Sequence, residues 1–338
     1  MAPAADSPTE TSSSVFTTIA SLRESLCSEE AALSLRFRAL FSLKHVGQTS
    51  EDPAVVTAVI DAIAAALSSP SALLKHELAY CLGQTNSDAA IKPLSDALSD
   101  LDEDVMCRHE AAEALGALGF TESLNLLRKF RDREGESVVI TETCEIAIDR
   151  IEWANSKERQ AEKLRQSDFA SIDPAPPMPE TNTTKSVEDL GAALMDTSKP
   201  LFKRYRAMFA LRDLASPPDL PTAVPAVQAL AKGFSDESAL FRHEIAFVFG
   251  QLCHPASVDA LTKALSDVNE ASMVRHEAAE ALGSLGDEEG VEDTLRKFLN
   301  DADSVVRDSI IVALDMAEHE KSAEAEYALI PDALTATA

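Results

Sequence analysis

Residues 108–116 read RHEAAEALG, and the same nine letters return at residues 275–283. Variants of this phrase, KHELAYCLG at residues 75–83 and RHEIAFVFG at residues 242–250, each begin 33 residues before one of the two copies. The two pairs of phrases are 167 residues apart. A helical phrase that recurs at a period of about 33 residues is typical of α-solenoids built from helical hairpins. The sequence therefore predicts a repeat protein whose repeats have been duplicated as a block.

The segments around these phrases support the same duplication. LSLRFRALFSLKHVG at residues 33–47 matches KPLFKRYRAMFALRDLA at residues 199–215, and SVVITETCEIAIDRIE from Ser137 matches SVVRDSIIVALDMAE from Ser304. Each unit has the form of a helix, a short polar turn and a second helix, with apolar positions three and four residues apart. We therefore predict an all-α fold, an α-solenoid of helical hairpins in two duplicated halves of four repeats each. The stretch DVMCRHEAAEALGALG at residues 104–119 closely resembles the second helix of a HEAT-like repeat, so the hairpins are expected to be HEAT-like.

Composition shifts along the chain predict five segments. Residues 1–20 are rich in Ser, Thr and Pro and are expected to form a disordered tail. The two halves are expected at residues 21–154 and 188–320, and a charged helix end followed by a Pro/Thr-rich linker is expected at residues 155–187. Residues 321–338 are expected to form a second tail.

Charge and composition narrow the classes of partner. Hydrophobic residues make up 45% of the chain but aromatic residues only 5%, which suits close-packed helices better than sheets. The net charge of -27 disfavours nucleic acid and anionic membranes and favours a basic partner, although acidity also serves plain solubility. The beginning of the chain lacks the apolar core of a secretion signal, no run of eighteen apolar residues occurs, and the five cysteines form no CxxC pair. We expect a cytoplasmic protein, with the nucleus left open as a second location.

The His-Glu dipeptide within each phrase is a candidate metal ligand. Adjacent helical residues point about 100° apart, so one dipeptide cannot surround a metal alone, but stacked helices about 8–10 Å apart can bring equivalent side chains together. Two His and a carboxylate with open positions suit non-haem Fe(II), while Mn(II) and Zn(II) accept similar atoms. The zinc-protease pattern HExxH is absent, because the second His is replaced by Tyr80, Glu113, Phe247 and Glu280. Each half therefore predicts one set, formed by His76 and His109 with Glu77, Glu110 or both, and by His243 and His276 with Glu244, Glu277 or both.

The alternative is that the dipeptide has no function. One His-Glu pair in a helix is usually solvated, and duplication can copy a meaningless dipeptide. However, the first and fourth repeats of each half share the scaffold and lack the pair, and the first repeats carry Phe37-Arg38 and Tyr205-Arg206 in its place. The pair is therefore kept only in the two central repeats of each half. His319-Glu320 lies out of register and is expected on a surface helix. The register favours the functional interpretation.

Other repeated residues are expected to serve the scaffold. The basic residue before each His is expected to pair with an acid of the next repeat, at Lys75, Arg108, Arg242 and Arg275. The two Arg pairs of the first repeats are expected to be solvated helix charges, at Arg36, Arg38, Arg204 and Arg206. The glycine seven residues after each His is expected to allow a neighbouring helix to approach, at Gly83, Gly116, Gly250 and Gly283. Gly119 and Gly286 are expected to end helices in the left-handed conformation.

Four His-Glu pairs in register within an eight-repeat HEAT-like array resemble deoxyhypusine hydroxylase, and the resemblance covers residues 21–320. It implies a di-iron monooxygenase with two Fe(II) ions per chain, which uses O₂ and an unidentified electron donor. Its implied substrate is the deoxyhypusine side chain of eukaryotic translation initiation factor 5A. The implied metal set is His76, Glu77, His109, Glu110, His243, Glu244, His276 and Glu277, with Glu77 and Glu244 assigned to the substrate amines. The rival interpretation is a non-catalytic HEAT scaffold or a bilin-lyase-like HEAT protein, which predicts no bound iron.

Overall fold

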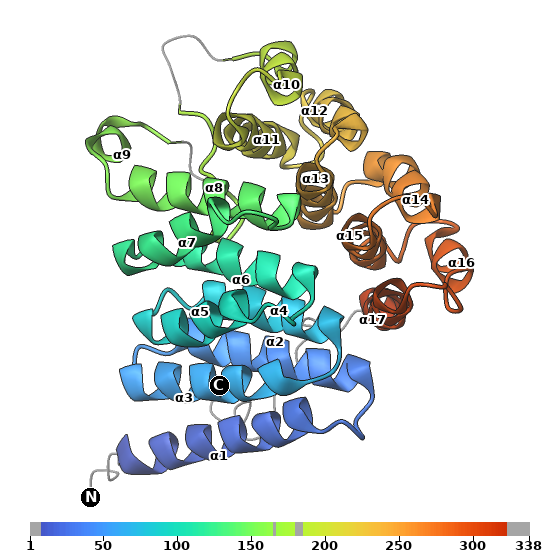
Figure 1. Ribbon diagram of the computed structural model, residues 1–338. Coiled ribbons are helices and arrows are strands. Elements are labelled where there is room, and N and C mark those ends of the chain that lie inside the picture. The colour runs from blue at the N-terminus through green and yellow to red at the C-terminus, as the bar shows by residue number, and fades with distance from the viewer. Residues whose placement is uncertain (1–7, 165–166, 180–184, 323–338) are drawn as a thin grey trace, which may run out of the picture.

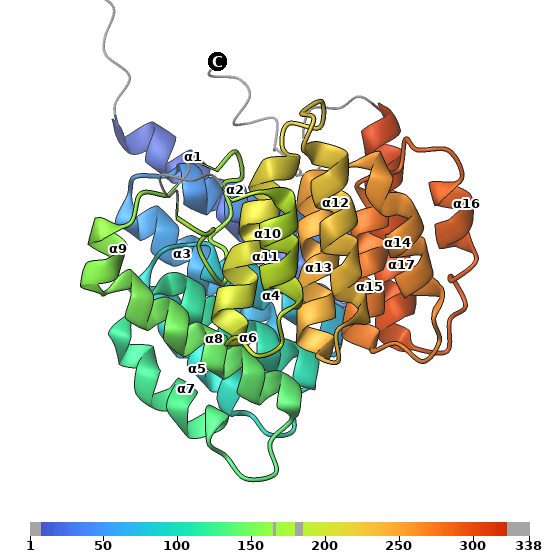
Figure 2. The same ribbon diagram turned by 90° about the horizontal axis from the view of Figure 1, so that it is seen from above.

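The computed structural model describes residues 8–164, 167–179 and 185–322, and this part of the chain is helical (Figures 1 and 2). None of its helices is both long and apolar enough to cross a membrane. The α-helices are α1 Pro8–Cys27, α2 Leu33–Thr49, α3 Pro53–Ala65, α4 Ala72–Gly83, α5 Ile91–Ser99, α6 Val105–Leu118, α7 Leu124–Arg131, α8 Val138–Ala154, α9 Lys157–Ala161, α10 Val187–Met195, α11 Leu201–Ala215, α12 Ala223–Ala231, α13 Ala239–Leu252, α14 Val258–Ser266, α15 Ser272–Gly283, α16 Val291–Arg296 and α17 Ser304–Ser322. Short 3₁₀ helices lie at Ala66–Ser68, Asp88–Ala90, Thr121–Ser123, Lys232–Ser235 and Pro255–Ser257.

Eight helical hairpins make up the two halves, as the sequence predicted. The first half consists of α1 to α8 and the second of α10 to α17, with α9 between them (Figure 1). The second helix of each hairpin packs on the second helix of the next, so that α4 contacts α6, α6 contacts α8, α13 contacts α15 and α15 contacts α17. The helices that carry the His-Glu pairs are therefore inner helices with a neighbour on each side.

Local signals explain where these inner helices begin. Ser71 and Ser238 occupy equivalent N-cap positions, and their hydroxyls accept hydrogen bonds from the backbone N–H groups of Leu74 and Phe241. Asp104 caps α6 in the same way, accepting from the N–H of Met106. Such side-chain acceptors satisfy N–H groups that the helix itself leaves unpaired. His76, His109 and His243 therefore follow a first turn held by a side-chain cap, whereas α15, which carries His276, begins after Ala271 without one.

The helix ends at the two predicted glycine caps differ. Gly119 has a φ of 76°, in the left-handed region, and ends α6 as predicted. The prediction for Gly286 is wrong, since it does not have positive φ. A Cβ added to Gly286 would lie 2.4 Å from the Cα of Ala317, so this glycine allows α17 to approach closely. The same LGxLG pattern therefore serves a left-handed helix end in one half and a close helix approach in the other.

The basic residues before the His pair with acids of the next repeat, which confirms that prediction. The ion pairs are Lys75–Glu103 at 2.5 Å, Arg108–Glu136 at 2.8 Å, Arg242–Glu270 at 2.6 Å and Arg275–Asp301 at 2.5 Å. In the first and third repeats of each half, an Arg also donates from Nε to the carbonyl of the Leu ten residues earlier. These bonds are Arg36 to Leu26, Arg108 to Leu98, Arg204 to Leu194 and Arg275 to Leu265. These carbonyls end the first helix of the hairpin, where a cation is favourable. Arg36, Arg204 and Arg206 are buried, so the prediction of solvated charges is wrong for them.

The two halves meet along two seams. At one seam α8 contacts α11 and α13, and at the other α17 contacts α2 and α4. The N-cap residue of α13, Ser238, donates to Glu142 of α8 at 2.7 Å, and that of α4, Ser71, donates to Asp308 of α17 at 3.4 Å. Arg38 adds a bidentate ion pair with Asp315 of α17, both bonds at 2.9 Å. The second seam therefore joins the two ends of the described chain without a covalent link, and Arg38 is not the solvated charge that was expected.

The connection between the halves is more ordered than a linker without hydrophobic period suggests. Residues 167–178, which we call the strap, lie against both halves, and residues 174–176 are buried. Backbone groups of Met178 and Arg206 form a hydrogen bond at 3.0 Å. Residues 165–166 and 180–184 lie outside the described residues.

The two ends of the described chain also differ from expectation. Helix α1 begins at Pro8, within the segment expected to be disordered, because Ile19, Leu22 and Leu26 pack into the core against α2 and α3. His319, expected on a surface helix, is buried in α17. Residues 1–7 and 323–338 lie outside the described residues, so the tails remain predictions.

Candidate metal centre

The four His-Glu pairs lie together at the centre of the molecule. Helices α4 and α6 supply two pairs, and α13 and α15 supply the other two. All eight side chains are buried, and His109 and His276 have no exposed surface. The set is His76, Glu77, His109, Glu110, His243, Glu244, His276 and Glu277. The register of the sequence therefore brought together every residue that it singled out.

The four imidazole rings form one cluster across the two halves. Within each half the ring centroids are 5.9 Å apart, for His76 and His109, and 5.5 Å apart, for His243 and His276. The rings also meet between halves, with 4.8 Å from His76 to His276 and 5.1 Å from His109 to His243. Contacts between the halves are thus as close as contacts within a half.

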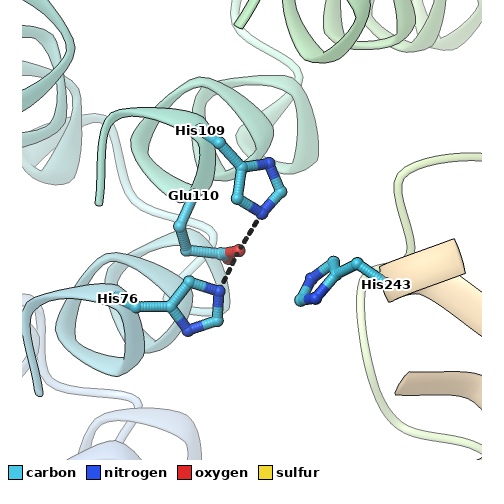
Figure 3. Close-up of side chains that lie close together, drawn as sticks. All are labelled: His76, His109, Glu110 and His243. Atoms are coloured by element: carbon cyan, nitrogen blue, oxygen red, sulfur yellow. Dashed lines mark ion pairs between the residues drawn. The ribbon is translucent and has the colours of Figure 1, made fainter. Parts of the chain in front are cut away.

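Two of the four glutamates lie between the histidines of their own half. Glu110 Oε2 is 3.2 Å from Nε2 of His76 and 3.5 Å from Nε2 of His109, as Figure 3 shows. Glu277 Oε2 is 3.5 Å from Nε2 of His276 and 3.8 Å from Nδ1 of His243. In both halves the glutamate of the third repeat therefore bridges the histidines of the second and third repeats.

Two groups of side chains have the proximity of metal ligands. The first is His76, His109, Glu110 and His243, and the second is His243, His276 and Glu277, with ligand atoms within 4.8 Å of one another in each group. His243 belongs to both groups and points toward the first (Figure 3). The sequence predicted one separate set in each half, and the structure does not separate the two groups strictly in this way. Glu77 and Glu244 belong to neither group. Glu77 lies 3.4 Å from Nδ1 of His76, and one carboxylate oxygen of Glu244 has no hydrogen-bond partner.

Two of the four histidines, His109 and His243, also have a hydrogen-bond partner outside the eight clustered residues. Nδ1 of His109 is 3.1 Å from the hydroxyl oxygen of Thr143, and that hydroxyl donates its proton to the carbonyl of Val139 at 2.7 Å. Because the only Thr143 proton is engaged, its oxygen accepts from Nδ1–H, which leaves the Nε2 lone pair of His109 toward the cluster. Nδ1 of His243 is likewise 3.0 Å from the carbonyl oxygen of Met273. Such contacts fix the tautomer that a metal requires.

Burial keeps most of these histidines neutral. Burial, together with the neighbouring histidines, lowers the pKa of His109 and His276 well below the usual value and lowers the pKa of His243 to about 3. For His76, burial acts in the same direction, but Glu110 and Glu77 outweigh it and raise the pKa well above its usual value. Neutral imidazole is the form that binds metal ions.

Two further acids, Glu113 and Glu280, line the same space and were not selected from the sequence. They follow His109 and His276 by one helical turn, and Glu280 Oε1 lies 3.5 Å from Nδ1 of His276. Burial raises the pKa of both well above the usual value, as it does for Glu244, and raises the pKa of Glu277 to about 8. Their identical register in the two halves was the available signal. The centre therefore holds more carboxyl groups than it has positive charge to balance.

A cavity of about 240 Å³ connects the cluster to the surface. Its inner part is lined by His76, His243 and the glutamates of the cluster. Tyr80 and Phe247, equivalent residues of the two halves, touch edge to face at a centroid distance of 5.9 Å beside it. The outer part is lined by Phe41, Lys44, Gln251, Ser284 and Met316.

Known proteins share these features. Residues 60–145 and 227–315 match the family model for HEAT repeats. A deoxyhypusine hydroxylase of Gibberella zeae is 70% identical over 338 residues, which is 100% of both chains, and one of Neurospora crassa is 74% identical over 93% of this chain and 97% of its own. The solved structure of human deoxyhypusine hydroxylase in complex with glycerol has a TM-score of 0.81 and 41% identity, covering 91% of this chain and 99% of that one.

Proposed function

The chain belongs to the deoxyhypusine hydroxylase family, and from this premise we propose that it works as a di-iron monooxygenase on a protein substrate. The proposed substrate is the deoxyhypusine side chain of eukaryotic translation initiation factor 5A, which receives one hydroxyl group and becomes hypusine. The proposed co-reactants are O₂ and an electron donor. We place the reaction in the cytoplasm, because all five cysteines are free thiols, as in a reducing compartment. The observation that carries the proposal is the cluster of four histidines and their glutamates.

The donor atoms in the cluster suit two iron ions. Both ring nitrogens of His76 and His276 and Nε2 of His109 are buried without a hydrogen-bond partner. Buried polar atoms are normally paired, so five such nitrogens in one cluster fit a site that binds cations. Two His and one carboxylate suit Fe(II) and leave coordination positions open, and bound iron would supply the activation of O₂. We propose that His76, His109 and Glu110 hold one ion and that His243, His276 and Glu277 hold the other.

The remaining glutamates provide a site for a cationic substrate. Glu77 and Glu244 belong to neither candidate metal group, and both are buried beside one. We propose that they accept hydrogen bonds from the substrate amines, with Glu113 and Glu280 adding negative charge around the same cavity. The amines of deoxyhypusine are cationic at neutral pH, so an acidic cavity attracts and orients them. The net charge of -27 extends this attraction to a substrate protein that presents a basic loop.

The decisive experiment combines iron analysis with mass spectrometry of the substrate. After reconstitution with Fe(II), we expect about two iron ions per chain, and incubation with deoxyhypusine-bearing factor in air should add the mass of one oxygen atom to the factor. Less than one iron per chain would contradict the metal assignment. Full iron loading without an added oxygen would contradict the proposed reaction. Either of these two outcomes would favour a non-catalytic scaffold over an enzyme.

Substitution of one ligand tests the assignment within the cluster. His109→Ala should remove about half of the bound iron and abolish hydroxylation, while the helical circular dichroism signal stays unchanged. The scaffold should survive because the α4, α6 and α8 contacts involve mainly apolar side chains. Loss of the helical signal would instead show that His109 is needed for folding.

A further inference from the structure

The strap binds the ends of two inner helices, at Gln84 after α4 and at Gln251 of α13, and Gln251 also lines the cavity. Gln84, which follows α4, donates to the carbonyl of Ile172 at 3.2 Å and accepts from its backbone N–H at 2.8 Å. Gln251 in α13, at the equivalent position of the second half, donates to the hydroxyl of Ser171 at 2.8 Å. Arg150 of α8 donates to the carbonyl of Asp173 at 3.1 Å. Neighbouring strap residues are therefore each held by a different helix.

Arg212 of α11 is the main anchor of the strap. Its buried guanidinium pairs with the carboxylate of Asp173 at 2.9 Å, donates to the hydroxyl of Ser167 at 3.1 Å and lies 4.4 Å from the centre of the Phe169 ring. It also keeps a pair with Asp213 at 3.2 Å on its own helix. Hydrogen bonds to a charged group in a buried setting are strong. Arg212 therefore fixes the strap at both Ser167 and Asp173.

Equivalent positions of the two halves differ in exposure around the mouth. Lys44 of the first half is half-buried at the rim, whereas its counterpart Arg212 is fully buried under the strap. Ser284 lines the outer cavity, whereas its counterpart Ala117 is buried. Gln84 is likewise buried, whereas Gln251 lines the cavity. Of the three counterparts on the second side, Gln84, Ala117 and Arg212, all are buried, and Gln84 and Arg212 bind the strap directly.

We propose that the strap closes one side of the mouth and that the substrate side chain enters by the other, between α2, α15 and α17. The identity of the substrate rests on the proposed function, while the closure rests on the contacts of the strap alone. The open rim is formed by Phe41, Lys44, Ser284 and Met316. The protein substrate therefore docks over these residues and approaches the cluster from a single direction.

The order of charges at the open side fits such a substrate. Lys44 is held at the rim with its ammonium group 4.7 Å from the centre of the Tyr80 ring, and among the described residues it is the only Lys or Arg that lines the cavity. Four glutamates of the same lining are buried, at Glu77, Glu110, Glu244 and Glu277. The substrate is a cationic side chain that projects from a backbone with exposed carbonyl groups. Lys44 at the rim attracts the carbonyl oxygens of that backbone, and the glutamates attract the amines of the side chain.

Thiol labelling at two equivalent positions tests the closure. Ser284→Cys and Ala117→Cys are made separately in the iron-loaded protein and treated with 2-aminoethyl methanethiosulfonate, and peptide mapping measures the labelling rate, with the exposed Cys253 as internal reference. We expect the Ser284→Cys thiol to react roughly tenfold or more faster than the Ala117→Cys thiol, since reaction of a covered thiol requires local opening. Adding Asp173→Ala should speed the reaction of the Ala117→Cys thiol, because the strap loses its anchor. Gln84→Ala, which removes both bonds to Ile172, serves as a second strap variant if Asp173→Ala is poorly folded.

Equal labelling of the two thiols with the native strap, or no response to either strap variant, would overturn the closure. The entry route is tested on the same samples, because the labelled Ser284→Cys protein should lose hydroxylation of the protein substrate while its iron content is unchanged. Turnover at the unlabelled rate would overturn the route. Absence of turnover in the unlabelled native protein would instead contradict the proposed function, and the labelling rates would still decide the closure.

Discussion

At the scale of single residues, the clearest support for the metal centre comes from the side chain that fixes His109. The Thr143 hydroxyl donates to Val139 and accepts from Nδ1 of His109, which directs Nε2 toward the cluster. Thr143→Val keeps the shape and removes this acceptor. We expect iron affinity to fall about 10- to 100-fold, as is common when a partner of a metal-bound His is lost. The measurement is competition for iron against a chelator of known affinity.

Thr143→Ser is the matched control for that prediction, because it keeps the hydroxyl and loses only a methyl group. It should retain iron almost as well as the native protein. Equal affinity in the Val and Ser variants would show that Thr143 serves packing alone.

The buried carboxyl groups predict how the metal-free protein responds to pH. Burial raises the pKa of Glu277 from 4.5 to about 8 and raises the pKa of Glu113 and Glu280 well above 4.5. The folded protein then retains protons that the unfolded chain has released, so the free energy of unfolding falls as pH rises through this range. The lowered pKa values of His109 and His243 act in the opposite direction, but only below 6.5, where the unfolded chain takes up protons.

Above pH 6.5 the carboxyl effect therefore acts without that opposition. We expect the thermal midpoint of the metal-free protein to fall by a few degrees between pH 6.5 and about 8. A bound divalent ion should remove most of this dependence, since it supplies the missing positive charge. Circular dichroism melts with a chelator and with Mn(II) give both curves. A midpoint that rises with pH in the metal-free protein would contradict the prediction.

The eight clustered residues could be predicted from sequence because register alone carries the information. One His-Glu dipeptide is uninformative, and His319-Glu320 illustrates this, since it lies out of register and His319 belongs to neither candidate metal group. Thr143 could not be selected in the same way, because its role depends on the rotamer of a His in the preceding repeat. Glu113 and Glu280 had a repeated position but no distinctive chemistry until burial was known.

At the scale of helices, the glycines of the repeated phrase offer a matched pair of substitutions. A Cβ on Gly83 would lie 2.8 Å from the Cα of Ala114, whereas a Cβ on the equivalent Gly250 would lie 3.5 Å from Ala281, an ordinary contact. We expect Gly83→Ala to lower the free energy of unfolding by about 1–3 kcal/mol, as overpacking usually does. Gly250→Ala should be neutral or should stabilise by up to about 1 kcal/mol, because alanine favours the helix.

Urea unfolding followed by circular dichroism measures both glycine variants. The contrast between them is the test, since helix propensity alone would make both substitutions stabilising. Equal effects at the two positions would show that the closer approach of α4 and α6 carries no energetic cost.

The helical hairpins were predictable because each apolar face recurs at the repeat period. Helix α1 was not, since its first part is rich in Ser and Thr and its position depends on packing against α2 and α3. The strap escaped prediction for a similar reason. Its Pro-rich sequence has no period, and its burial depends on Gln84 and Arg212, which are distant in the chain.

At the scale of the whole molecule, the seam between α17 and α2 has no covalent link among the described residues, and it lies beside the cavity rim at Met316. Its bidentate pair, Arg38–Asp315, is about a fifth exposed on each side. Asp315→Ala should change global stability by no more than about 1 kcal/mol, as expected for a partly exposed ion pair. Hydrogen exchange in α17 and α2 should nevertheless rise, because local opening there separates the halves without unfolding either of them.

Glu152→Ala is the control for the seam, because it removes an exposed pair with Arg128 within the first half. In this variant the hydrogen exchange rate of α17, measured by mass spectrometry, should equal that of the native protein. A similar rise of exchange in both variants would show that the Arg38 pair does not hold the seam.

Gene duplication by itself yields redundancy, since either copy of an element can perform the task of the other. The strap belongs to neither copy, and it lies over one side of the cavity only. Equivalent residues such as Lys44 and Arg212 therefore have different tasks, one toward an incoming molecule and the other toward the strap. The segment that connects the two copies has in this way allowed equivalent residues of the copies to take on different functions.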